Sequence, residues 1–158
     1  MLPKKTKYAI KALVLLAKRH GDKTPLKITE IAELEKIPRK FLETILLELR
    51  KQGILKSKMG VNGGYLLMKD PTDIFLSTII RVTGGPIALL PCASLNFYER
   101  CEECIDEVTC GLRQVIIDVR KESLRILSGT SIADLVEREN KLLALHQTGQ
   151  DPDISSLN

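Results

Sequence analysis

The sequence feature that most constrains the fold is a glycine-rich turn between two short strand-like stretches. Asn62 and Gly63 separate residues 54–58, which alternate in the manner of a strand, from the apolar residues 65–67. Both turn residues tolerate the positive φ that tight hairpin turns require. This part of the chain therefore predicts a β-hairpin.

Three helical patterns precede the hairpin, over residues 4–19, 28–34 and 38–52. Apolar residues recur at helical spacing in each, which indicates helices with one buried face. We expect Thr29 to cap the second helix and Pro38 to occupy the first turn of the third. The third helix is expected to direct these residues inward: Phe41, Leu42, Ile45, Leu46 and Leu49. Three helices and a hairpin, with a short turn between the second and third helices, predict a mainly α, winged helix-turn-helix fold over residues 1–70.

Composition excludes several classes of protein. The 158 residues are 44% hydrophobic and 28% charged, which is typical of a globular protein. With no Trp and only three Tyr and three Phe, the core must be aliphatic, and a protein that stacks single-stranded bases on aromatic side chains is disfavoured. The longest apolar run, residues 12–17, is too short to span a membrane, and the Lys and Arg residues around it do not fit a signal peptide. We expect a soluble, cytoplasmic protein.

Charge divides the chain into a basic and an acidic half. Residues 1–70 hold 16 Lys and Arg against 7 Asp and Glu, whereas residues 71–158 hold 8 against 13. This division predicts a surface for a polyanion at one end of the molecule. Lysines that only keep helices soluble would give the same balance, so charge alone leaves both interpretations open.

The third helix carries the candidate DNA-reading residues. The major groove of double-stranded DNA admits one α-helix, whose N-terminal turns usually meet the bases. Four polar residues lie on the outward side of these turns: Arg39, Lys40, Glu43 and Thr44. In the hairpin, Lys56, Lys58 and Asn62 stand where a wing would touch flanking phosphates or the minor groove. The alternative is that an exposed helix face is charged in any case.

The second half of the chain is expected to contain three further units. Residues 71–110 combine a fourth helix, over 73–82, with an irregular segment that holds every cysteine. Residues 111–145 combine a long amphipathic helix from Gly111 with a last short helix, which begins at a capping box at Ser131 and Asp134 and ends near Asn140. A long amphipathic helix outside a small DNA-binding module most often pairs with its copy in a homodimer, although it could also fold back on its own domain. The polar residues 146–158 are expected to form a mobile tail.

Four cysteines lie within 19 positions: Cys92, Cys101, Cys104 and Cys110. Thiolates suit iron–sulfur clusters and zinc, and the spacings of eight, two and five residues fit an irregular cluster-binding loop better than the paired cysteines of a zinc ribbon. A thiol–disulfide switch, most simply at Cys101 and Cys104, and inert thiols remain alternatives.

An enzyme is not expected. His20 and His146 are the only histidines, and neither has a nucleophile at motif spacing. A Cys-x-x-Cys thiol oxidoreductase would need that motif to open a helix after a strand, and the βαβ pattern is missing. This remote alternative predicts no salt-dependent binding to duplex DNA.

The sequence resembles the Rrf-type winged-helix regulators, a family that includes IscR, NsrR and CymR. The similarity extends from the N-terminus to about Glu139, and the following segments carry it: Lys7-Tyr8-Ala9, Ile31-Ala32, Ile37-Pro38, Phe41-Leu42, Leu49-Arg50-Lys51, Gly53-Ile54-Leu55 and, most specifically, Gly63-Gly64-Tyr65-Leu66-Leu67. The resemblance implies a homodimeric transcription factor that binds two half-sites of double-stranded DNA and dimerises through its long helix.

The resemblance also implies a cofactor. Many members bind a [2Fe–2S] cluster, and some a [4Fe–4S] cluster, through three cysteines that correspond here to Cys92, Cys104 and Cys110. Members such as IscR carry a ligating His three residues after the last of these, where this chain has Arg113, and the additional Cys101 could supply the fourth ligand. The Arg that usually precedes the first wing glycine is Met59 here. The expected cofactor is therefore an iron–sulfur cluster, with [2Fe–2S] favoured and zinc as the alternative.

Overall fold

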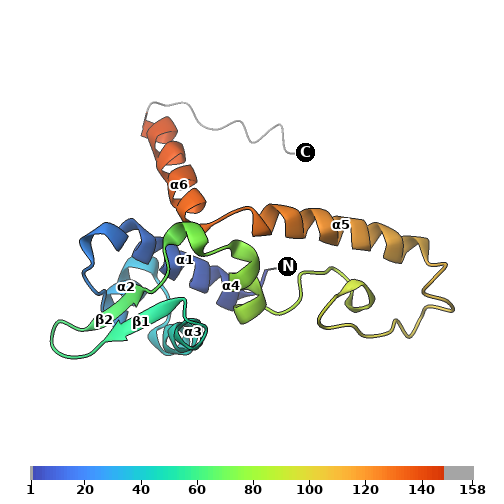
Figure 1. The fold of residues 1–158 in the computed structure, drawn as a ribbon, viewed down its shortest axis with the longest axis horizontal. Helices are drawn as coiled ribbons and strands as arrows, with labels where there is room; N and C mark the ends of the chain where they lie inside the picture. The colour runs from blue at the N-terminus through green and yellow to red at the C-terminus, as the bar shows by residue number, and fades with distance from the viewer. Residues whose placement is uncertain (1, 148–158) are drawn as a thin grey trace.

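The structure is a computed structural model, and it describes residues 2–147 (Figure 1). The expected tail lies outside the described residues from position 148 onward. In chain order the elements are α1 (Lys4–Lys18), η1 (His20–Asp22), α2 (Ile28–Glu35), α3 (Arg39–Lys51), β1 (Leu55–Lys58), β2 (Gly64–Leu67), η2 (Pro71–Asp73), α4 (Leu76–Thr83), η3 (Pro91–Ala93), α5 (Gly111–Ser128) and α6 (Ile132–Gln147). This order confirms the mainly α, winged helix-turn-helix fold.

The hydrophobic core lies where α1 packs against α3, α4 and α6. The centre of α1 contributes Ala9, Ala12 and Leu13, which are fully buried, and the small alanine side chains let neighbouring helices approach closely. The inward face of α3 adds four fully buried residues, Leu42, Ile45, Leu46 and Leu49. The core is aliphatic, as the composition requires.

Phe41 is the exception to the expected inward face of α3. Its side chain is 42% exposed, and its ring packs edge-on against Tyr8 of α1 with the ring centroids 5.8 Å apart. The prediction that Phe41 points into the core is therefore wrong. It closes the edge of the α1–α3 contact instead.

The wing is an antiparallel pair in which Leu55 lies opposite Leu67 and Lys58 opposite Gly64. Leu26, just before α2, extends this pair through two backbone hydrogen bonds with Tyr65, at 3.0 and 2.8 Å. The contact explains Gly64, because a Cβ at this position would lie 2.4 Å from the carbonyl oxygen of Leu26. The wing is thus held against the helix-turn-helix.

The turn of the wing differs from the expectation. A hydrogen bond of 2.9 Å from the Gly63 amide to the Gly60 carbonyl closes it, so Val61 and Asn62 occupy the central positions. Positive φ occurs at Gly60 and Gly64 rather than at Asn62 or Gly63. Gly63 is needed for a different reason, since a Cβ there would lie 2.4 Å from the carbonyl oxygen of Lys58.

The N-cap of α2 and the first residue of α4 differ from the expectations. Lys27, not Thr29, is the N-cap of α2, and its amide donates to the Glu30 carboxylate at 2.7 Å. Residues 73–75 do not belong to α4, because the Ile74 carbonyl accepts from the amide of Ile132, the first residue of α6, at 2.9 Å and the Leu76 amide donates to the Thr130 carbonyl at 3.0 Å. This long-range pairing holds the backbone extended up to Leu76.

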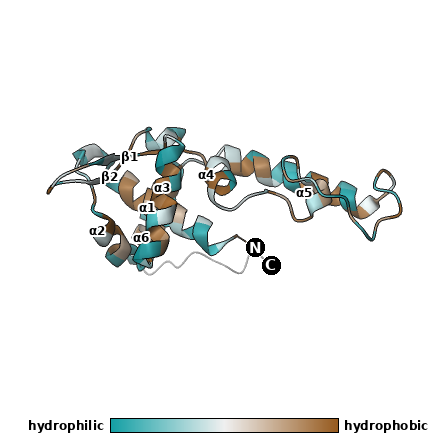
Figure 2. Ribbon diagram, turned by 90° about the horizontal axis from the view of Figure 1, so that it is seen from below, coloured by the Kyte–Doolittle hydropathy of each residue, from teal (hydrophilic) through white to brown (hydrophobic). Residues whose placement is uncertain are grey.

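α5 and α6 leave the winged helix in different directions (Figure 1). α5 lies beside α4 and η3 and extends away from the core, so in this chain it does not fold back over the winged helix (Figure 2).

α6 packs on α1, where Lys18 donates to Glu139 at 2.7 Å. α6 continues to Gln147, beyond the expected end near Asn140. The Glu137–Lys141 ion pair, at 2.6 Å, spans this position, and residues with high helix propensity follow it. None of the described helices is long and apolar enough to cross a membrane.

Candidate functional site

The outward residues at the start of α3 form one exposed polar surface. Arg39, Lys40, Glu43 and Thr44 are all exposed. Arg39 Nε lies 3.4 Å from Glu43 Oε1, and the Thr44 hydroxyl donates to the carbonyl of Lys40 at 3.5 Å. Both members of the ion pair are more than half exposed, so the pair is weak and its partners are available to a ligand.

A cleft lies between the start of α2 and the wing, with Arg50 of α3 at its side. Arg50, near the end of α3, donates to Ser57 of β1 at 3.1 Å and joins the helix to the wing. The cleft is lined by residues from the start of α2, the end of α3 and the wing, among them Lys27, Arg50 and Lys58. Sequence analysis missed Lys27 and Arg50, because only the tertiary fold brings these two cations beside Lys58.

The wing presents its other predicted residues to solvent. Lys56 and Lys58 project from the same side of β1, since side chains alternate along a strand. At the tip Asn62 is exposed, as is Met59, with 93% of its side chain accessible. An apolar side chain therefore occupies the tip at the position where the family resemblance leads one to expect an Arg.

In the cysteine segment, residues 92–110, one cysteine differs from the other three in burial. Cys92 is buried in η3, whereas Cys101, Cys104 and Cys110 are half-buried. Desolvation, followed by the hydrogen bond with Cys110 and the charges of Cys110 and Cys101, raises the pKa of the Cys104 thiol above its ordinary value. The Cys104 thiol donates to the Asp106 carbonyl at 3.3 Å. Cys104 is therefore near enough to Cys110 and Cys101 for both to influence its pKa.

Arg113 links the separate parts of this segment. Its backbone amide donates to the sulfur of Cys110, the N-cap of α5, at 3.4 Å. Its Nε donates to the carbonyl of Cys92 at 3.0 Å and lies 3.9 Å from a carboxylate oxygen of Glu107. A cationic side chain that cannot ligate a metal thus occupies the position of the family's His and connects Cys92 to the start of α5.

Glu107 extends the same network. It accepts from the Tyr98 hydroxyl at 2.7 Å and from the Cys101 amide at 3.0 Å. The Tyr98 hydrogen bond, followed by that from Cys101, lowers the pKa of Glu107, and the same contact raises the pKa of Tyr98. An ionised Glu107 therefore fixes the backbone beside Cys101.

The donor set fits an iron–sulfur cluster or zinc in its chemistry, since four soft thiols lie in one segment. Within residues 2–147, however, no group of three or more His, Cys, Asp or Glu side chains is arranged to hold a metal ion. Cys92 is tied to α5 through its backbone, and the other three thiols lie in the irregular loop. Bringing all four around one centre requires this loop to rearrange.

Exposed recognition-helix residues, a wing and a long projecting helix define a transcriptional regulator of the winged helix-turn-helix class. The family model described as Rrf2, iron-dependent transcriptional regulator, matches residues 2–138. This chain belongs to the Rrf2 family of transcriptional regulators. The relatives that it matches are transcriptional regulators and not enzymes.

The relatives cover nearly the full length of the chain. It is 41% identical to an rrf2-like HTH-type regulator of Rhodobacter capsulatus, over 89% of this chain and 95% of that one. It is 32% identical to NsrR of Geobacillus kaustophilus, over 89% and 92% of the two chains. Among solved structures, CymR of B. subtilis, described as the global cysteine regulator, superposes with a TM-score of 0.72 at 30% identity and covers 87% of this chain and 97% of its own. IscR of T. potens reaches 0.69 at 27% identity, with 88% of each chain covered.

Proposed function

We propose that this protein is a homodimeric regulator that binds two half-sites of double-stranded DNA and senses iron–sulfur status or redox signals through a cysteine-ligated cluster. In this proposal residues 1–70 bind DNA, residues 71–110 sense and residues 111–145 dimerise. One observation carries it. Cys110 is both a candidate ligand and the N-cap of the exposed helix α5, so the loop and the helix share a residue.

DNA recognition is assigned to α3 and the wing. Arg39 can donate to guanine, Glu43 can accept from cytosine, and Lys40 and Thr44 can reach phosphates or base edges in the major groove. Lys56 and Lys58 contact flanking phosphates, and Asn62 sits at the wing tip. The mutual pairing of Arg39 and Glu43 in the free protein is weak enough to be exchanged for base contacts.

Dimerisation is assigned to the apolar stripe of α5. Leu112, Val115, Val119 and Ile126 recur on one face and are each at least 41% exposed. Helices in proteins are stabilised mainly by packing of an apolar face, so this exposed face is suited to a partner. A second copy of the same helix offers an identical apolar face and closes the interface by two-fold symmetry.

The cluster is assigned to Cys92, Cys104 and Cys110, with Cys101 as the fourth ligand in place of the family's His. A [2Fe–2S] cluster is favoured over [4Fe–4S]. Several acidic residues lie near these cysteines in the sequence. Their negative charges are tolerable beside a bound cation but disfavour the thiolate form of a bare reactive cysteine. When the loop rearranges around the cluster or releases it, Cys110 and Arg113 move together with the start of α5. This movement changes the distance between the two recognition helices of the dimer.

The alternative keeps DNA binding and makes the cysteines a thiol switch or a zinc site. The influence of Cys110 on the pKa of Cys104 favours this second candidate, because it indicates that the two thiols are near each other. The raised pKa of Cys104 opposes it, since less of the reactive thiolate is present near neutral pH.

Fluorescence anisotropy with random-sequence duplex DNA across a salt series tests the DNA-binding part. We expect affinity to fall steeply with salt, because Lys and Arg contacts release counterions from the phosphates. Binding that is absent or independent of salt would contradict the proposal and favour the oxidoreductase alternative. The same measurement on an operator duplex, with cluster-loaded, zinc-loaded and disulfide-oxidised protein, separates the two candidates, since only the state that regulates should change the affinity.

A further inference from the structure

Cys92 is the one buried cysteine of the chain, and the short turn that carries it, η3, lies against α5. Only 6% of Cys92 is exposed, and only 1% of Ala93, the next residue. On either side of η3 the chain is irregular, and Leu89 and Leu95 are each 66% exposed. Because so short a segment has little packing of its own, its buried position depends on its contacts with α5.

Two arginines of α5 hold this turn through its backbone. Nε of Arg113 donates to the carbonyl of Cys92 at 3.0 Å, and a guanidinium nitrogen of Arg120 donates to the carbonyl of Ala93. The two arginines are seven residues apart, which is about two helical turns, so both project from the same face of α5. Consecutive carbonyls of η3 therefore accept from two cations on one helix.

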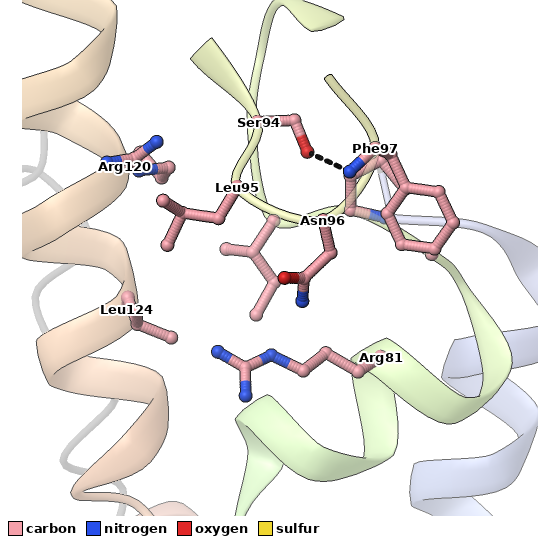
Figure 3. Close-up of a pocket in the computed structure, with 10 residues that line it drawn as sticks. Arg81, Ser94, Leu95, Asn96, Phe97, Arg120 and Leu124 are labelled. Atoms are coloured by element: carbon pink, nitrogen blue, oxygen red, sulfur yellow. Dashed lines mark hydrogen bonds between the residues drawn. The ribbon is translucent and has the colours of Figure 1, made fainter.

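The two carbonyls have no other partner. Within residues 2–147, the arginines are the only hydrogen-bond donors that reach them. Ser94, the next residue, turns toward Phe97 instead, whose amide donates to the Ser94 hydroxyl oxygen at 3.1 Å (Figure 3). Because both carbonyls belong to buried residues, loss of either arginine leaves an acceptor without a partner or opens the turn to water.

Arg113 also contacts the far end of the cysteine segment. Its backbone amide donates to the sulfur of Cys110 at 3.4 Å, and its Nε lies 3.9 Å from Glu107, which accepts from the Cys101 amide at 3.0 Å. Cys110 is the N-cap of α5, so it stays with the helix if η3 moves away. Separation of η3 from α5 can thus be local, since it breaks the contact with Cys92 and spares the one with Cys110.

We propose that Arg113 and Arg120 form a latch that controls access to the thiol of Cys92. While both hydrogen bonds are made, η3 lies on α5 and this thiol is closed to metal ions and to thiol reagents. When they break, η3 separates from α5 and Cys92 becomes reactive, whereas Cys101 and Cys110 are accessible in either state. The latch is independent of any cofactor. Its consequence, that Cys92 is the last cysteine to join a cluster, rests on the proposed function.

Pulse labelling with N-ethylmaleimide tests the latch in the reduced, metal-free, full-length protein without DNA. Mass spectrometry of proteolytic peptides gives the labelling rate of each cysteine. We expect Cys92 to react at least about tenfold more slowly than Cys101 and Cys110, because its labelling requires local opening. Cys104 is left out of this comparison, since its raised pKa slows its own reaction.

Arginine variants identify what holds the turn closed. Arg113→Gln and Arg120→Gln should each accelerate the labelling of Cys92 about tenfold, because each removes a charge-assisted hydrogen bond to a buried carbonyl. Loss of a positive charge by itself disfavours a nearby thiolate and slows labelling, so acceleration reports opening. The matched control is Arg125→Gln, which removes the same charge from α5 at a side chain that is 71% exposed, and it should leave the rate unchanged.

Melting curves followed by circular dichroism verify that each variant is folded at the labelling temperature. Arg113→Lys and Arg120→Lys, which keep the charge and lose the guanidinium fork, repeat the test with a milder change if a Gln variant unfolds. The proposal is overturned if Cys92 of the parent reacts as fast as Cys101 and Cys110, or if the variants at Arg113 and Arg120 accelerate it no more than Arg125→Gln does. The assay contains neither cluster nor DNA, so its failure is distinguishable from a failure of the proposed function.

Discussion

The winged helix and the long helix α5 differ in how much of their apolar surface the chain itself buries. The inward residues of α3 are fully buried, whereas none of the 18 described residues of α5 is buried and Leu112 stays 64% exposed. Helices in proteins are stabilised mainly by packing of their apolar face. The first region therefore carries its own core, whereas the second leaves apolar side chains that the described part of this chain does not cover.

The largest expected effect is on the core of the first region. Leu46→Ala should lower the free energy of unfolding by about 2–5 kcal/mol, since it removes a fully buried side chain and leaves a cavity. Urea unfolding followed by circular dichroism measures it. The matched control is Leu47→Ala, at the next position on α3 with a side chain 40% exposed, which should cost well under half as much. Equal losses would show that the core does not dominate stability.

The second effect concerns the exposed stripe of α5. Val119→Glu should weaken dimerisation by roughly thirtyfold, about 2 kcal/mol, because it replaces apolar contact with a charge. Sedimentation velocity across a concentration series measures the dissociation constant. Gln114→Glu adds the same charge outside the stripe and should have little effect. A Val119→Glu protein that dimerises as well as the parent would place the interface elsewhere.

A smaller effect is expected at the junction between the two regions. Ser131 and Asp134 form the capping box of α6: the Ser131 hydroxyl oxygen accepts from the Asp134 amide at 3.2 Å, and the Asp134 carboxylate accepts from the Ser131 amide at 2.7 Å. Ser131→Ala should cost about 1 kcal/mol of stability, measured by thermal unfolding. Ser128→Ala, at an exposed position that ends α5, is the control. No difference between the two variants would show that the cap does not stabilise α6.

The same cap predicts a pH dependence. Hydrogen bonds from the side chain and backbone of Ser131 lower the pKa of Asp134 in the folded protein. The stabilisation is therefore complete above the ordinary Asp pKa and is lost as pH falls through the lowered value. Between neutral and acidic pH, the stability difference between the parent and Asp134→Asn should shrink. A constant difference would contradict this assignment.

The smallest expected effect is on DNA affinity, when a single phosphate contact of the wing is removed. Lys58→Ala should weaken binding to every duplex alike and reduce the slope of log affinity against log salt by about 1. Anisotropy titrations with the operator and with random DNA measure both quantities, and Lys69→Ala, at an exposed lysine after β2, is the control. A changed sequence preference with an unchanged slope would mean that Lys58 contacts bases.

The comparison of the two regions also explains what could be predicted from the sequence. The helices and wing of residues 1–70 were predicted correctly because their apolar spacing is local and their faces are buried in this chain. The N-cap of α2 and the wing turn are local errors, whereas two other errors arise where distant segments meet. The Phe41 ring packs against Tyr8 at the edge of the core, and α4 begins late because Ile74 and Leu76 pair with residues around the start of α6.

Side-chain chemistry was harder to predict than the fold. The exposed positions of Arg39, Lys58 and the other candidate DNA contacts follow from helical and strand periodicity. The partners that side chains find between elements do not, because Arg50 reaches Ser57 of the wing only after folding. The sequence also gives no sign that Arg113 donates to the carbonyl of Cys92.

The central claim, that the cysteine segment holds a cluster coupled to α5, is tested most directly by the visible absorption spectrum of protein purified without oxygen. Iron and acid-labile sulfide are assayed on the same sample. We predict a brown protein with near-stoichiometric sulfide, and loss of colour in single Ala variants of Cys92, Cys104 and Cys110, with Cys101→Ala showing whether it is the fourth ligand. A protein that stays colourless after reconstitution with iron and sulfide would contradict the claim and leave a thiol switch or a zinc site.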